Sequence, residues 1–157
     1  MLTRFHAPPA PECDAGEHLW VLAGLPALSA HTLDRWLDAL HELTREQWAR
    51  VADESASGDV ETGANGIRRA IDAAIHQHRL DVAAWFLRDA VETTLYYAIR
   101  TPLRAPEFSA SEIARIHRAT EWAAMAIAAE KWLDRSVCDA LIAPFELTVL
   151  SVSPQLL

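Results

Sequence analysis

Several features that mark common classes of protein are scarce in this sequence. Its 157 residues include two cysteines and five glycines. Cys13 and Cys138 are too far apart to form a CxxC motif, and two cysteines do not make a disulfide framework, so we expect a reducing compartment, the cytoplasm. No GxSxG, HExxH, Walker or dinucleotide-binding fingerprint is present, which excludes the easily recognised enzyme classes but not enzymes in general.

Long apolar runs are also missing. The longest uninterrupted run, residues 122–129, has eight residues, whereas a membrane-spanning helix needs about 20. Residues 19–30 have the length of a signal-peptide apolar region. Acidic residues and prolines precede them where a signal peptide has a short basic start, so we expect neither export nor a membrane span.

Basic residues are too few for a phosphate-binding surface. The formal net charge is −8, and residues 1–66 contain eleven acidic residues against four arginines. Without an Arg or Lys stripe, we expect binding neither to nucleic acid nor to a membrane surface. The acidic first part leaves open a different hypothesis, in which the protein mimics nucleic acid and inhibits a basic partner.

Apolar residues, by contrast, are abundant. They make up 51% of the chain and include six tryptophans, a composition typical of a packed globular protein of one domain. Pro8, Pro9 and Pro11 favour extended backbone near the N-terminus. We therefore predict a Pro-rich arm over residues 1–16 and a single helical domain over residues 17–157.

The spacing of the apolar residues predicts helices. Leu33, Trp36, Leu37 and Leu40 recur at the i, i+3, i+4, i+7 intervals of a helix with one buried face, and Ser29 or Thr32 is the expected N-cap. Ile67, Ile71, Ala74 and Ile75 form the stripe of another helix. Between these two helices, the polar residues 55–63 predict a loop.

Two local motifs indicate further helix starts. Thr44–Gln47 and Ser109–Glu112 both have the pattern of a capping box, in which the first and fourth residues bond to each other's backbone N–H groups. The second box would begin a long, Ala-rich helix, which we expect to be central because small alanine side chains let neighbouring helices approach closely. A last helix is expected at about 135–150, kinked or broken at Pro144.

Residues 80–101 are apolar on nearly every side, which predicts a helix in the middle of a bundle or against a partner. With no convincing pair of strands, the expected fold is an all-α, single-domain bundle of about five or six helices, mostly antiparallel.

Two histidines near residue 77 are candidates for chemistry. In a helix, residues two apart point in nearly opposite directions, so His76 and His78 cannot chelate one metal ion. His76 projects to the polar side near Asp72, whereas His78 projects onto the apolar stripe. His78 could therefore be a general base paired with a carboxylate, or a core histidine bonded to a backbone carbonyl.

The candidate carboxylate partners of His78 are Asp89 and Glu92. They share one sector of the next helix with Tyr96 and Arg100. This sector could line a ligand pocket between the third and fourth helices, with His78, Asp89, Glu92 and Tyr96 as catalytic candidates. It could equally be the one side of a central helix that contacts water.

Four arginines lie near the predicted start of the long helix: Arg100, Arg104, Arg115 and Arg118. Arginines beside a helix N-terminus attract phosphate or carboxylate groups, so they form a possible anion-binding site. Glu107 and Glu112 could simply neutralise them. We expect no metal site, since the chain has no Glu-x-x-His element, and no cofactor.

These observations favour a small acidic helical protein that acts in protein–protein interaction or assembly, without catalytic activity. Its apolar surface is more than a bundle of this size must bury, so the expected partner is another protein or a second copy, with a homodimer preferred. The alternatives are the helical-bundle pocket, as a ligand-binding protein or enzyme, and the acidic mimic.

Overall fold

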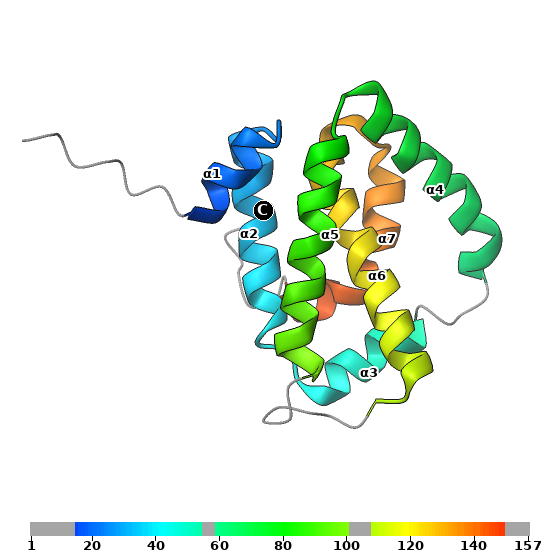
Figure 1. Ribbon diagram of the computed structural model, residues 1–157. Coiled ribbons are helices and arrows are strands. Elements are labelled where there is room, and N and C mark those ends of the chain that lie inside the picture. Colours follow the sequence, from blue (N-terminus) through cyan, green and yellow to red (C-terminus); the bar gives the residue numbers. More distant parts are fainter. Residues whose placement is uncertain (1–14, 55–58, 101–107, 150–157) are drawn as a thin grey trace, which may run out of the picture.

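The computed structural model describes residues 15–54, 59–100 and 108–149, and within these ranges all regular structure is helical (Figure 1). The elements, in order, are α1 (Ala15–Leu22), α2 (Ala27–Leu40), α3 (Arg45–Glu54), α4 (Asp59–Gln77), α5 (Asp81–Leu95), a π-helical turn η1 (Tyr96–Arg100), α6 (Ala110–Ala128), a short 3-10 turn η2 (Glu130–Trp132) and α7 (Arg135–Val149). The predicted all-α fold is confirmed.

Helix α6 is the centre of the bundle. It packs against α2, α3, α5 and α7, and it runs antiparallel to α5 (Figure 1). Its second half is buried at every position from Ala123 to Ala128, where small side chains let the neighbouring helices approach closely. The prediction of a central Ala-rich helix is therefore confirmed.

The core around α6 is assembled from most of the other helices. Its largest fully buried side chains are Trp48, Phe145, Leu33, Leu40, Ile71, Leu87, Leu95 and Ile116. Trp36 and Phe145 meet edge to face across α2 and α7, with their ring centroids 5.3 Å apart. The apolar stripes predicted for α2 and α4 thus face the core, although Ile67 and Ile75 are only half-buried.

Both predicted capping boxes are present. The backbone N–H of Thr44 donates to Gln47 Oε1 over 2.7 Å, and the N–H of Gln47 donates to Thr44 Oγ1 over 3.3 Å. At the start of α6, the N–H of Ser109 donates to Glu112 Oε2 over 2.8 Å, and the N–H of Glu112 donates to Ser109 Oγ over 3.2 Å. Each box satisfies two backbone groups of its own segment, which is why the sequence alone reveals it.

Helix α2 begins earlier than predicted. Its N-cap is Pro26, which makes no side-chain capping bond, and Thr32 instead lies within the helix and donates to the Leu28 carbonyl over 3.0 Å. The prediction of Ser29 or Thr32 as N-cap is wrong. Proline has no side-chain acceptor for the first N–H groups of the helix, but its fixed φ suits the entry to a helix, and its carbonyl accepts the first helical bond, from the N–H of Ala30, over 3.0 Å.

Helices α1 and α4 end in the same way. At the end of α1, the N–H of Leu25 donates to Trp20 O over 2.9 Å and Gly24 has a φ of 93°. At the end of α4, the N–H of Leu80 donates to Ile75 O over 2.8 Å, and Arg79 has a φ of 56°. Both are Schellman motifs, in which a left-handed residue reverses the chain and directs the following leucine into the core.

Three further boundaries differ from the predictions. Helix α4 begins at Asp59, so the predicted loop at 55–63 is wrong from residue 59 onward, and residues 55–58 lie outside the described residues. Polar composition alone does not distinguish a loop from the first turn of a helix.

Helix α7 continues through Pro144, so it is not broken there. Helix α1 includes Ala15, within the arm predicted for residues 1–16; residues 1–14 are not among those described.

Helix α5 has an exposed side, so the first of the two predicted positions, the middle of the bundle, is wrong, and the second, against a partner, stays a prediction. Its inner side, which includes Ala83, Leu87 and Val91, is buried, while Val82 and Trp85 face solvent. None of the described helices is both long enough and apolar enough to span a membrane.

Candidate functional site

The exposed side of α5 and η1 is the best candidate for a functional surface. We call it the α5 outer face and define it by seven residues: Asp81, Val82, Trp85, Asp89, Glu92, Tyr96 and Tyr97. All seven are classed as exposed. The face therefore combines three aromatic rings and a valine with three carboxylates.

The aromatic rings on this face are large and only partly covered. Trp85 is 64% exposed, and Tyr96 and Tyr97 are 52% and 55% exposed. Trp85 meets the half-buried Phe86 edge to face, with ring centroids 5.0 Å apart, and Tyr96 meets Tyr97 in the same way at 5.3 Å. These contacts restrict the rings before any partner binds, which lowers the entropy lost on binding.

The π-helical turn presents both tyrosines. The N–H of Tyr96 is shared between the carbonyls of Glu92 and Thr93, and the wider turn continues to Arg100. A π-helical turn increases the number of residues per turn, so the successive side chains of Tyr96 and Tyr97 remain on the exposed side while Ala98 and Ile99 are buried. No sequence pattern signalled this turn.

The sector predicted from the sequence is present, and it faces water. Asp89, Glu92, Tyr96 and Arg100 are all exposed. Trp85, which the sequence reasoning left among the apolar residues of a buried helix, belongs to the same side. Because α5 is apolar on nearly every side, its sequence does not show which side packs against the neighbouring helices.

His78 does not face the core. Helix α4 ends at Gln77, so His78 lies in the following turn, outside the helical periodicity from which burial was predicted, and it is exposed. Its imidazole stacks on the indole of Trp132, with ring centroids 4.7 Å apart and planes at 21°. The predicted burial of His78 is wrong; Asp89 and Glu92 are exposed on α5, whereas the ring contact of His78 is with η2.

A charged cluster joins α5 to α6 beside the outer face. Arg88 Nε lies 3.1 Å from Glu121 Oε1, and His117 Nδ1 lies 3.8 Å from Glu121 Oε2. The Arg88–Glu121 ion pair connects α5 to α6. The carboxylate of Glu121 therefore already has a charged partner within the chain. The parts of the chain that the structure describes contain no group of three or more His, Cys, Asp or Glu placed to hold a metal ion.

The N-terminus of α6, where an anion site was predicted, is capped by groups of the chain itself. Ser109 and Glu112 cap this helix, and hydrogen bonds from Ser109, aided by the positive charges of Arg115 and Arg45, lower the pKa of Glu112. Arg100 and Arg118 are exposed and Arg115 is half-buried, while Arg104 lies outside the described residues. Of the four predicted arginines, Arg115 lowers the pKa of Glu112, and Glu107 lies outside the described residues, so the anion site and its neutralisation by Glu107 and Glu112 both stay predictions.

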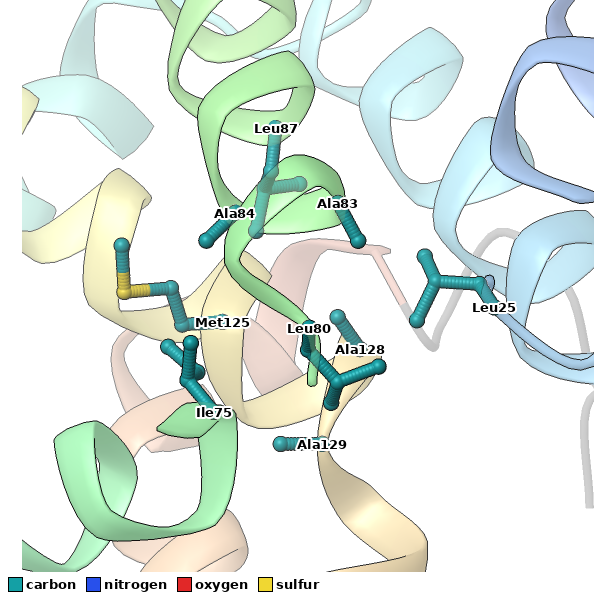
Figure 2. Close-up of a pocket in the computed structure, with 9 residues that line it drawn as sticks. All are labelled: Leu25, Ile75, Leu80, Ala83, Ala84, Leu87, Met125, Ala128 and Ala129. Atoms are coloured by element: carbon teal, nitrogen blue, oxygen red, sulfur yellow. The ribbon is translucent and has the colours of Figure 1, made fainter. Parts of the chain in front are cut away.

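A small cavity lies beside α6, next to the Schellman motifs that end α1 and α4 (Figure 2). Its volume is about 10 Å³, roughly enough for one water molecule. Nine residues line it: Leu25, Ile75, Leu80, Ala83, Ala84, Leu87, Met125, Ala128 and Ala129. All are apolar, and neither His78 nor the carboxylates of α5 are among them, so this cavity is not the predicted catalytic pocket.

Comparison with protein-family models, with curated proteins and with solved structures finds no match for this chain.

Proposed function

We propose that this protein is a protein–protein interaction or assembly module without catalytic activity, and that it forms homodimers. The carrying observation is its exposed apolar surface. Eight large apolar or aromatic side chains are between 47% and 80% exposed: Leu19, Val21, Leu22, Leu28, Val82, Trp85, Tyr96 and Tyr97. Isolated exposed apolar residues are ordinary, but groups of them mark interaction surfaces.

The eight residues form two groups of different chemistry. Four belong to α1 and the first turn of α2, which we call the α1–α2 corner: Leu19, Val21, Leu22 and Leu28. The other four lie on the α5 outer face, among carboxylates. In a twofold-symmetric dimer each surface meets its own copy, so the apolar α1–α2 corner suits self-association better than the acidic face does.

The remaining parts of the proposal rest on the sequence. The acidic charge and the lack of a basic stripe favour a protein partner over nucleic acid or a membrane surface, and the sparse cysteines favour the cytoplasm.

The homodimer is tested by replacing the two most exposed residues of the corner, Leu22 and Leu28, at 69% and 80% exposure. We expect wild-type protein to be dimeric by light scattering and native mass spectrometry. Leu22→Ser with Leu28→Ser should weaken dimerisation by about tenfold or more, since each leucine contributes on the order of 1 kcal/mol in a partly buried contact.

The matched control is Trp85→Ala, which removes a large side chain, 64% exposed, from the other surface. It should leave the dimer intact. A wild-type protein that stays monomeric at every concentration would contradict the homodimer proposal.

A further inference from the structure

The α5 outer face has charge as well as apolar area. Its three carboxylates, Asp81, Asp89 and Glu92, are exposed. Arg88 is also exposed and lies within the span of the face, but its Nε is 3.1 Å from Glu121 Oε1 on α6, so three carboxylates stand against one arginine that has its own partner. Arg79, two residues before Asp81, and Arg100, three residues after Tyr97, are exposed beyond the two ends of the face. A complementary surface must therefore supply both apolar side chains and positive charge.

The shape of the face favours a helical ligand. Val82 and Tyr96, near the two ends of the face, are fourteen residues apart, which corresponds to about 21 Å along α5 and the start of η1. It is a narrow strip with apolar side chains near both ends and Asp89 and Glu92 between them. A helix with one apolar stripe flanked by lysines or arginines matches such a strip, with its stripe against the rings and its cations beside the carboxylates.

We propose that the α5 outer face binds a basic amphipathic helix of a partner protein. This inference rests on the proposed function, since it takes the chain to be an interaction module, but it uses a different surface from the dimer. Charge decides against a second copy here: a twofold contact would place Asp89 and Glu92 against the same carboxylates of the other chain. Trp85 is the expected anchor, since tryptophan is enriched among the residues that dominate interface energies.

The test uses a defined probe, a labelled synthetic peptide of about 18 residues, which is five helical turns. The peptide has Leu at the i, i+3, i+4, i+7 positions of one stripe and Lys elsewhere. Two control peptides are required: one with Glu in place of every Lys, and one with the same composition in an order that has no apolar stripe. Binding is measured by fluorescence anisotropy at several salt concentrations.

Three variants locate the site. Trp85→Ala should weaken binding by about tenfold or more, and its exposure means that the fold should survive, as circular dichroism will show. Asp89→Lys with Glu92→Lys should weaken binding and reduce its salt dependence. Asp38→Lys with Asp53→Lys makes the same change of net charge at exposed acids of α2 and α3, and should bind the peptide nearly as wild type does.

The proposal is overturned if the basic peptide does not bind, if the order without a stripe binds equally well, or if the two charge-reversed variants behave alike. It is also overturned if Trp85→Ala abolishes dimerisation, which would identify a second copy as the occupant. Failure of the homodimer is separate: a strictly monomeric protein that binds the peptide through Trp85 would retain this inference.

Discussion

At the residue scale, two positions control how α1 and α4 end. Gly24 and Arg79 have the left-handed backbone of a Schellman motif, at φ values of 93° and 56°. Glycine adopts this region without steric cost, whereas a residue with a Cβ is disfavoured there by about 1 kcal/mol. An added Cβ at Gly24 would meet no atom within 4 Å, so its cost would come from the backbone.

The first prediction follows from this contrast. Arg79→Gly should raise the free energy of unfolding by about 0.5–1 kcal/mol, and Gly24→Ala should lower it by about 1 kcal/mol. Urea denaturation monitored by circular dichroism measures both. A loss of stability in Arg79→Gly would contradict the prediction and would mean that the Arg79 side chain makes a contact worth more than the backbone strain.

The second prediction concerns Cys138. This side chain is 3% exposed, its Sγ lies 3.8 Å from the Ala126 carbonyl oxygen, and burial raises the pKa of its thiol. Burial limits access of a reagent to the sulfur, and the raised pKa reduces the fraction of thiolate. Iodoacetamide should therefore label Cys138 much more slowly in native protein than in urea, as peptide mass spectrometry would show; equal labelling rates would contradict the burial.

At the element scale, close packing depends on the small residues of α6. Ala124 is fully buried, whereas Ala114 on the same helix is exposed. Ala124→Leu should cost about 1–3 kcal/mol of stability because the core has no room for three extra carbons. Ala114→Leu is the matched control and should change stability by less than about 0.5 kcal/mol. Thermal denaturation of both variants decides this third prediction.

The two capping boxes allow a fourth prediction with an internal control. Ser109→Ala and Thr44→Ala should each cost about 1 kcal/mol at pH 7. The box at α6 contains an ionisable group, Glu112, whose pKa is lowered in the folded state chiefly by hydrogen bonds with Ser109; the box at α3 contains neutral Gln47.

A lowered folded-state pKa stabilises the protein above the pKa of unfolded glutamate, and this contribution is lost as pH falls through the folded-state value. The cost of Ser109→Ala should therefore shrink at acidic pH, below about 4. The cost of Thr44→Ala should change much less. Urea denaturation at several pH values measures both, and equal pH dependence would contradict the role of Glu112.

Elements defined by neighbouring residues were the most predictable. Both capping boxes and the stripes of α2 and α4 follow from contacts within one turn or two of the same helix. The misassigned elements lack such local evidence. Pro26 caps α2 without a side-chain bond, and the end of α4 depends on Arg79, a residue type that rarely adopts its conformation there.

At the scale of the whole molecule, the fifth prediction concerns thermal stability. If the α1–α2 corner forms a dimer, folding and association are linked, so the melting temperature of wild-type protein should rise with concentration. Leu22→Ser with Leu28→Ser should weaken this dependence, and Trp85→Ala should preserve it. Differential scanning calorimetry over about a hundredfold range of concentration, which shifts a linked equilibrium by about 2.7 kcal/mol, makes the comparison.

The candidate site was only half predictable from the sequence. Asp89, Glu92 and Tyr96 were grouped correctly because helical spacing places them on one side of α5; Arg100 is also exposed, but it lies at the end of the π-helical turn, which changes that spacing. Trp85 was not, since on a helix that is apolar nearly all round the sequence does not say which apolar residues are covered. His78 was misplaced because the helix ends one residue before it.

The sequence by itself determined the all-α fold, the two capping boxes and the central Ala-rich helix, because these depend on periodicity and on contacts between near neighbours. Only the tertiary structure decided which side of α5 is exposed, because α2 and α6, which are separated from α5 by other segments of the chain, cover its inner side. The rings and carboxylates of the α5 outer face share one surface for that reason: burying Leu87 and Val91 against α6 leaves Trp85 in water.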